Sequence, residues 1–318
     1  MSLFIFFMQQ MLLFTVPLIV AGIGGMYCER SGIINIGMEG NMIVGAFSGC
    51  LFLHYATQNG AGQLSFLIAI LIGGLCGMLY SMLHALASIR FSANQAISGI
   101  ALNIAAPALS VFLARSVTGK QQVTFGNAFR IEEVPFLSKI PVLGDIFFKK
   151  TYLSLYIAIM IFVAGAVVID HTRFGMRLRA CGDNPHAADS VGIHVQSVRY
   201  RSVAICGLLA GMAGVMLVVP TSTEFNASIA GYGFLAVSVL ILGRWKPSGI
   251  LLAAVFFGIT KTLAAVYSAI PMFAALEWDA FIYRMIPFVA TLLVLTFSST
   301  KAQGQPLAAG QPYDKGAR

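Results

Sequence analysis

The sequence predicts an all-α polytopic membrane protein with about nine transmembrane helices, within a range of eight to ten. Hydrophobic residues make up 58% of the 318 residues and charged residues only 10%, whereas an ordinary globular domain has roughly 25% charged residues. The mean hydropathy is +0.83. Stretches such as residues 153–169 are apolar on every face, which is typical of membrane helices and not of alternating barrel strands. This composition excludes a soluble enzyme, a disordered chain and a nucleic-acid-binding protein, despite the net charge of +8.

Intervals without Lys, Arg, Asp or Glu mark the predicted spans. The second and the seventh are short for a bilayer, which needs about 20 helical residues. Up to Tyr27 the first interval contains no Lys or Arg, so it lacks the basic region of a signal peptide and is interpreted as a retained span. The intervals are residues 3–26, 41–56, 64–87, 94–114, 152–169, 202–220, 233–243, 250–270 and 281–297.

A broken or re-entrant segment is predicted near residues 31–41, between the first two spans. Unpaired polar groups that face lipid cost several kcal/mol, so this stretch must pack inside the protein. Its glycines and polar residues are Gly32, Asn35, Gly37, Glu39, Gly40 and Asn41.

The distribution of Lys and Arg predicts the orientation of the chain. The densest basic loop, residues 171–201, is placed in the cytoplasm, and the N-terminus then lies outside. The loop of residues 115–151 also falls outside although it carries several basic residues, because long loops constrain topology less. Residues 1–300 are expected to form one transmembrane domain, and residues 301–318 a flexible, solvated cytoplasmic tail.

The sequence shows no catalytic or metal-binding motif. The HExxH pattern is missing, and Thr260 stands before Lys261-Thr262 where a phosphate-binding loop requires Gly. The cysteines form no CxxC pair, so neither a disulfide framework nor a zinc site is indicated. A membrane enzyme is therefore not expected, and if the chain takes part in ATP-driven transport, the ATP must bind to another chain.

The basic loop contains the pattern of a short docking helix. Asn184-Pro185 predicts a turn and a helix start, because Pro is tolerated in the first turn. A short helix is expected over residues 186–191, between Gly182 and Gly192. On these residues alone, a docking element for another protein and a plain cytoplasmic basic loop are equally supported. The residues singled out are Arg173, Gly175, Arg177, Arg179, Gly182, Asn184, Pro185, His186, Ala188 and Gly192.

Several motifs resemble one protein family. The run Glu29-Arg30-Ser31-Gly32-Ile33-Ile34-Asn35-Ile36-Gly37-Met38-Glu39-Gly40 resembles the "ERSGxINIGxEG" hallmark of permease subunits of bacterial nucleoside and simple-sugar ATP-binding cassette (ABC) importers. Residues 179–188 resemble the "RAxGxNPxAA" coupling segment of that family, with Cys181 as a minor departure, and residues 243–249 resemble its "LGRxxPxG" turn. Pro312-Tyr313-Asp314-Lys315 is similar to the end of the shorter second permease of nucleoside importers.

The resemblance implies partners that this chain lacks. It implies an ABC ATPase that receives the coupling segment, a second permease in a heterodimer, and a lipid-anchored binding protein that delivers substrate outside. It further implies a bacterial inner-membrane location with a cytoplasmic C-terminus. No cofactor is expected on this chain, since ATP and Mg²⁺ belong to the ATPase. Nucleosides are the implied substrates and simple sugars the alternative. An ion-coupled secondary transporter, and after it a membrane receptor or scaffold, are the other classes considered.

Polar residues inside the predicted spans are candidates for the substrate path. For Glu39, a structural role within the broken segment is favoured over lining the path. Lys261 lies deep in the eighth span and is expected to pair with Glu39, or otherwise to meet a polar substrate. The complete set is Asn35, Glu39, Asn41, Asn94, Gln95, Asn103 and Lys261. Charged residues expected outside form a solvated rim or a docking surface, and they are Arg115, Lys120, Arg130, Glu224, Glu277 and Asp279.

Overall fold

In the computed structural model, every predicted span coincides with a helix. The residues described are 2–58, 60, 62–126, 129–135, 137–270, 273, 279–298 and 304–314. Within them, six helices are long and apolar enough to cross a membrane. These are α1 (Ser2–Arg30), α3 (Gln63–Ala85, continued by the π-helix η1, Leu86–Arg90), α4 (Gln95–Thr118), α6 (Leu153–His171), α9 (Val195–Thr221) and α11 (Pro247–Val266, continued by the 3₁₀ helix η3, Tyr267–Ala269). The remaining predicted spans are α2 (Met38–Thr57), α10 (Tyr232–Leu242) and α13 (Ala280–Ser298). The chain is a polytopic, mainly α-helical membrane protein.

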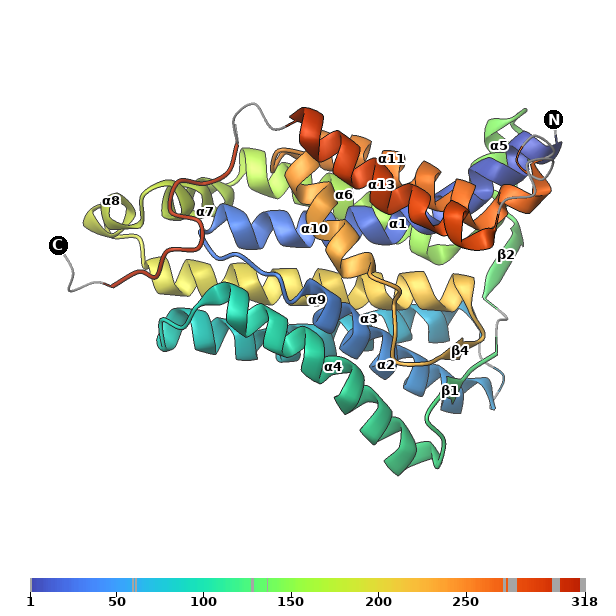
Figure 1. The fold of residues 1–318 in the computed structure, drawn as a ribbon, viewed down its shortest axis with the longest axis horizontal. Coiled ribbons are helices and arrows are strands. Elements are labelled where there is room, and N and C mark those ends of the chain that lie inside the picture. The colour runs from blue at the N-terminus through green and yellow to red at the C-terminus, as the bar shows by residue number, and fades with distance from the viewer. Residues whose placement is uncertain are drawn as a thin grey trace.

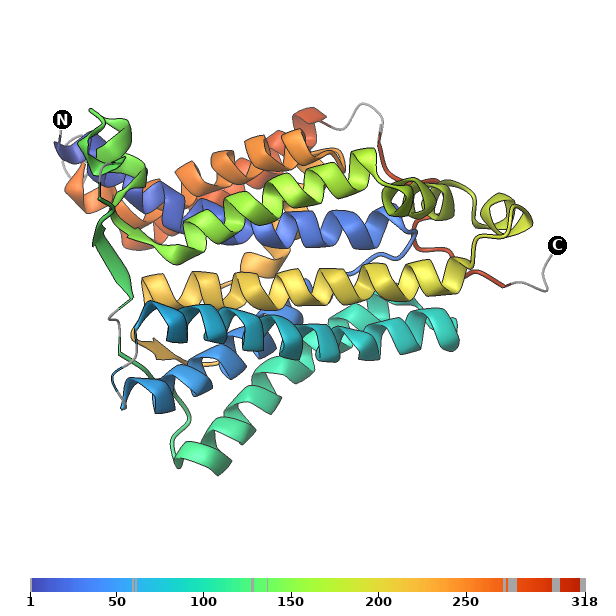
Figure 2. The same cartoon turned by 180° about the vertical axis from the view of Figure 1, so that it is seen from behind.

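The two ends of the helix bundle carry different elements, as Figures 1 and 2 show. One end, called the α8 end, holds α7 (Arg173–Asp183), α8 (Pro185–Ser190) and residues 304–314. The start of α1 and short elements of the 115–151 region lie at the opposite end, called the α5 end. The loops expected in the cytoplasm and outside therefore lie at opposite ends, as the predicted orientation requires.

Short elements cover the α5 end. The strands pair as two antiparallel ribbons, β1 with β4 and β2 with β3, so the 115–151 region is fastened to the end of α9 as well as to itself. The elements are β1 (Val123–Thr124), β2 (Arg130–Glu133), the 3₁₀ helix η2 (Leu137–Lys139), α5 (Leu143–Phe147), β3 (Lys149–Tyr152) and β4 (Glu224–Phe225).

Helix α9 runs through the centre of the bundle. In its most apolar stretch 83% of the residues are buried, whereas the corresponding share in α4 is 17%. Helix α4 splays away from the other helices (Figure 1). Glycines let α9 approach α3 closely: a Cβ on Gly207 or Gly211 would collide with α3, and one on Gly77 would collide with α9. Small residues four apart are the usual means by which membrane helices bring their backbones together.

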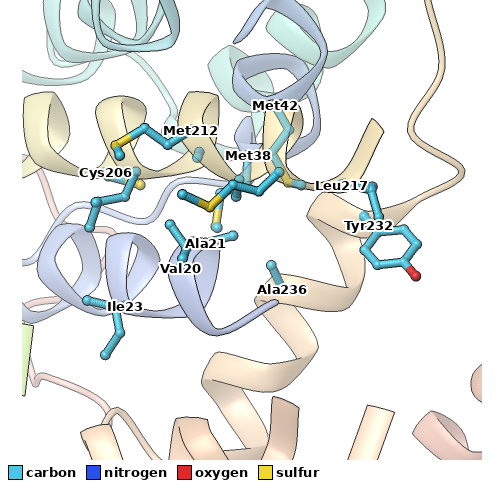
Figure 3. Close-up of a cluster of buried hydrophobic side chains, with 14 of the residues drawn as sticks. Val20, Ala21, Ile23, Met38, Met42, Cys206, Met212, Leu217, Tyr232 and Ala236 are labelled. Atoms are coloured by element: carbon cyan, nitrogen blue, oxygen red, sulfur yellow. The ribbon is translucent and has the colours of Figure 1, made fainter. Parts of the chain in front are cut away.

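A hydrophobic cluster fixes α1, α2, α9 and α10 to one another. Figure 3 shows Val20 and Ala21 of α1 beside Met38 and Met42 of α2, with side chains of α9 and α10 closing the cluster. Flexible methionines fill the irregular gap that arises where two helices begin inside a bundle.

Both α2 and α10 begin inside the bundle. Residues 31–37 form no helix and run back from the α8 end to the start of α2 (Figure 1). Residues 222–231 return from the end of α9 to the start of α10 and include the two-residue strand β4. The predicted broken segment near residues 31–41 is present, with its last four residues inside α2.

Two expectations are corrected by the fold. The basic stretch of residues 171–201 is mostly helical, because Thr172 caps α7 and Leu178 and Cys181 give that helix a buried face. Arg199, expected among the loop arginines, lies in α9 and is only 1% exposed.

The second correction concerns the tail. Residues 304–314 pack on the α8 end, with Ala308 and Tyr313 only 5% and 8% exposed, so the expectation of a solvated extension is wrong for them. Their N–H and C=O groups find partners there, which is why a segment without apolar periodicity is ordered. Residues 301–303 and 315–318 lie outside the described residues.

Candidate coupling surface and transport cavity

The basic stretch of residues 171–201, in which the resemblance places a coupling segment, contains two capped helices before α9 begins. The side-chain oxygen of Thr172 accepts a hydrogen bond from the N–H of Gly175 at 3.2 Å. Asn184 does the same for Ala187 at 3.0 Å, and Pro185 occupies the first turn of α8. These caps satisfy N–H groups that a helix start leaves free. The short helix predicted over residues 186–191 is confirmed as Pro185–Ser190.

The predicted coupling residues divide into a buried and an exposed set. Gly175 and Gly182 are buried. Each lies so close to another backbone that a Cβ would collide with it, at Ile169 and at Arg30 respectively, so only glycine fits there. Arg179 is half-buried, with its Nη1 3.8 Å from Oδ1 of Asp170. Buried members of the set are Gly175, Gly182, Pro185 and Ala188, and exposed members are Arg173, Arg177, Asn184, His186 and Gly192. The exposed members form a basic and polar surface at the α8 end.

Cys181, which departs from the family motif, belongs to the buried face of α7. Burial raises the pKa of its thiol above the ordinary value, so the thiol stays protonated at neutral pH. A protonated, buried thiol is a packing group and not a nucleophile.

Side chains from α3 and α4 hold the backbone of the broken segment. Gln95 Oε1 accepts the N–H of Ile34 at 2.7 Å, and His84 Nε2 donates to the Ile34 carbonyl at 3.0 Å. Asn103 donates to the Ile36 carbonyl at 2.9 Å and accepts the N–H of Gly40 at 2.8 Å. Gln95 and Asn103, predicted as polar residues of the span, therefore replace the hydrogen bonds that a continuous helix would have made.

The other polar residues of this region differ in their partners. Asn35 donates to the Cys206 sulfur at 3.3 Å. Asn41 is fully buried, and its side-chain amide makes no hydrogen bond among the described residues. Asn94 is exposed and caps α4, accepting from Ala96 and Ile97 at 3.0 and 3.1 Å, and with Ile34 and Gly310 it lines a second cavity of about 460 Å³.

Glu39 connects the starts of α2 and α10. Its Oε1 accepts the N–H of Gly231 at 3.0 Å and its Oε2 accepts the N–H of Gly233 at 2.6 Å. A carboxylate at a helix N-terminus is stabilised by free N–H groups and by the helix dipole. Glu39 and Lys261 form no ion pair within 4.0 Å, so the predicted direct pair is wrong. The Glu39 carboxylate instead binds the N–H groups at the start of α10.

Lys261 instead lines a cavity of about 570 Å³. Its Nζ lies 4.9 Å from the ring centroid of Tyr232 and 5.4 Å from that of Phe288. The lining combines aromatic, hydroxyl, amide and charged side chains from α1, α9, α10, α11, α13 and residues 222–230. The polar and aromatic members are Phe14, Thr221, Ser222, Glu224, Phe225, Asn226, Ser228, Tyr232, Lys261, Arg284 and Phe288.

Tyr232 is a lining residue that sequence reasoning missed. Its side chain is 4% exposed, and its hydroxyl makes no hydrogen bond among the described residues. Figure 3 shows the hydroxyl pointing away from the hydrophobic cluster. Since Tyr is common in apolar spans, nothing in the local sequence distinguished it. His84 was also missed, although an ionisable side chain within an apolar span is a usable signal.

The charged residues expected outside lie at the α5 end as far as the structure describes them. Glu224 belongs to β4, which pairs with β1, and Arg130 Nε donates to the Lys150 carbonyl at 3.3 Å. Arg115, Lys120 and Asp279 are exposed. Glu277 lies outside the described residues.

The fold and the capped helices at one end define a multi-span permease subunit, and comparison with known proteins agrees. Residues 7–295 match the family described as branched-chain amino acid transport system / permease component, and the chain belongs to this family of transport permeases. It is therefore a non-catalytic transport subunit of a multi-pass type.

Among transport permeases, two relatives that match over nearly their full length are permease proteins of ABC transporters. The chain is 40% identical to the nucleoside ABC transporter permease protein NupC of Lactococcus lactis, over 96% of both chains. It is 38% identical to the guanosine ABC transporter permease protein NupQ of Bacillus subtilis, again over 96% of both. A glucose ABC transporter permease protein of Haloferax volcanii, TsgB13, is 28% identical over 80% of this chain and 68% of that protein. No solved structure matches the chain.

Proposed function

We propose that this chain forms half of the translocation path of an ABC importer for nucleosides. The observation that carries the proposal is the end-to-end similarity to two permeases named for nucleoside and guanosine transport. The similarity extends over both the coupling region and the cavity. It therefore supports the kind of solute as well as the dependence on an ATPase.

The α7–α8 region is proposed to dock on a separate ATPase. Its exposed face presents Arg173, Arg177 and His186 on helices whose N-termini are capped, which makes it a firm contact surface. ATP-driven closure of the ATPase would move this region and switch the helices between inward and outward access. The α8 end and the C-terminus then lie in the cytoplasm, and the α5 end meets a substrate-binding lipoprotein outside.

The cavity is proposed as part of the solute path. Its volume of about 570 Å³ falls within the roughly 300–1,000 Å³ of small-molecule sites. Phe288, which is 51% exposed, offers a ring face on which a base can stack, and Glu224 and Asn226 offer acceptors for sugar hydroxyls. The same polar groups suit a simple sugar, which is the alternative that the glucose-permease relative favours.

Uptake by the reconstituted importer tests the proposal. The complex of this chain, its ATPase, the second permease and the binding lipoprotein is placed in liposomes and offered purine nucleosides, pyrimidine nucleosides and pentoses. ATP-dependent uptake of nucleosides supports the proposal, and uptake of pentoses alone supports the sugar alternative. Uptake without ATP in an ion gradient would identify a secondary transporter instead.

A pair of cap variants tests the coupling role of α8. Asn184→Ala should leave the complex assembled but uncouple ATP hydrolysis from uptake, because α8 loses its cap. Asn94→Ala removes the same kind of cap from exposed α4 and should leave coupling intact. Each change costs about 1 kcal/mol of helix stability, so a difference between them reflects position. Equal effects on coupling would contradict the role of α8.

A further inference from the structure

The described C-terminal residues, 304–314, form a segment that we call the strap. It crosses the α8 end beside α7 and α8, as Figure 1 shows at the red end of the chain. The N–H of Ala308 donates to the Gly182 carbonyl at the end of α7 at 2.9 Å, and the N–H of Gly310 donates to the Gly32 carbonyl at 3.0 Å. The strap therefore links the coupling region directly to the broken segment.

A buried arginine lies at the centre of this link. The guanidinium of Arg199 donates from Nε to the Ser31 carbonyl and from Nη1 to the Gln311 carbonyl, both at 3.2 Å. Among the described residues, no carboxylate lies within 4.0 Å of it. A buried cation with no carboxylate beside it among the described residues depends on the carbonyls and the ring that face it, so Arg199 holds the strap and the broken segment together.

Tyr313 closes the link to α8. Its ring centroid lies 5.9 Å from the guanidinium carbon of Arg199 and 5.2 Å from the ring of His186 in α8. Burial first, and then the Asp189 carboxylate, raise the pKa of the Tyr313 hydroxyl, so the ring remains neutral over Arg199. One side chain thus touches the coupling helix and the buried arginine at once.

The contacts form a continuous path between two functional regions. From α8 the path runs through His186, Tyr313 and Arg199 to Ser31, and Ser31 accepts a further hydrogen bond from Ser202 Oγ at 2.7 Å. Seven residues beyond Ser31 the chain enters α2, where Glu39 holds the start of α10 beside the cavity. Packed and hydrogen-bonded chains of this kind can carry coupling between distant sites.

We propose that the strap positions α8 on the broken segment, so that α8 and the start of α2 move together during the transport cycle. Tyr313, Gln311 and Arg199 are then positioning residues for coupling, although they touch neither ATP nor solute. The proposal rests on the proposed function, because it presumes that an ATPase moves α8.

Two matched strap variants in the reconstituted importer test this role. Tyr313→Ala removes the ring that touches both partners, whereas Leu307→Ala truncates a strap side chain that is 82% exposed. Tyr313→Ala should lower solute uptake per ATP hydrolysed about tenfold, within the range of ordinary coupling energies, while ATP hydrolysis continues. Leu307→Ala should leave the ratio unchanged. An unchanged ratio in Tyr313→Ala overturns the proposal, whereas failure of the unaltered complex to couple ATP to uptake overturns the proposed function instead.

A cross-link supplies the second measurement, which stands even if Tyr313→Ala fails to assemble. Ala187→Cys and Pro312→Cys place thiols at exposed positions next in sequence to the His186–Tyr313 contact, which stays intact. A bifunctional thiol reagent joins them in the assembled importer, with each single variant as a control. If α8 and the strap move as one unit, the cross-linked importer keeps the uptake of the same variant before treatment. Loss of uptake on cross-linking, with both single variants active after the same treatment, would show that they must separate and would overturn the proposal.

Discussion

Two segments enter the bundle from opposite ends, and they are held in different ways. Residues 31–37 are held along their backbone by His84, Gln95 and Asn103. Residues 222–231 are fastened at their ends, by the β1–β4 pairing and by Glu39, and the stretch between lines the cavity. Polar residues therefore serve the architecture in the first segment, while the second leaves side chains free to face a solute.

The comparison teaches how to interpret polar residues within apolar spans. Gln95 and Asn103 were candidates for the solute path because they are polar, yet both are bonded to main-chain groups of the broken segment. Nothing in the sequence marked Tyr232 as a candidate for the solute path, yet its hydroxyl lacks a hydrogen-bond partner among the described residues. An unsatisfied hydrogen-bonding atom beside a cavity is a candidate for binding the solute, and whether an atom is satisfied depends on its neighbours in space.

The largest expected effect comes from removing the Glu39 carboxylate, which joins the start of α2 to the end of the second segment. Glu39→Ala removes the acceptor of two N–H groups at the start of α10, which should cost roughly 2–5 kcal/mol. The melting temperature of the purified complex should fall and uptake should be lost. Glu39→Gln keeps one carbonyl acceptor and should lose less. If Glu39→Ala kept the stability and the uptake of the unaltered protein, Glu39 would not be what holds the start of α10.

A smaller loss of stability is expected from loosening the first segment alone. Asn103→Leu keeps the approximate volume but leaves the Ile36 carbonyl and the Gly40 N–H without their partner. The cost should be about 1–3 kcal/mol, seen as a lower melting temperature. Ser116→Ala on the same helix removes a bond from an exposed hydroxyl and is the control. If the two variants have the same melting temperature, Asn103 does not hold the backbone of the segment.

Asn94→Ala tests a predicted path residue that caps α4 and does not line the cavity beside Lys261. Loss of the α4 cap should cost about 1 kcal/mol, and the affinity for solute should stay unchanged in uptake assays. A change in the KM for uptake without a change in melting temperature would indicate that Asn94 does line the solute path.

The smallest effect on stability is expected at the cavity wall of the second segment. Tyr232→Phe removes a hydroxyl that makes no hydrogen bond among the described residues, so the free energy of unfolding should stay within about 0.5 kcal/mol. The KM for uptake should rise about tenfold if that hydroxyl bonds the solute. An unchanged KM, with Lys261→Met also unaffected, would exclude this cavity from the path.

The sequence predicted much of the fold because membrane helices are specified locally. Uncharged apolar intervals located every span, and glycines with polar residues located the break near residues 31–41. Asn184-Pro185 located α8, since a cap and a first-turn proline act over one turn of helix. Helix α7 was missed because its buried face is made of a few apolar residues among arginines.

What the sequence alone determined is the class of protein, the spans, the break and the coupling helix, because each depends on residues that are close in the chain. The tertiary structure decided which polar groups meet: Glu39 with the α10 amides, Arg199 with the strap, and Lys261 with Tyr232. These partners are separated by many residues, and the physical reason is general. A buried polar group takes the nearest available donor or acceptor in space, and only the packing of the helices fixes which one that is.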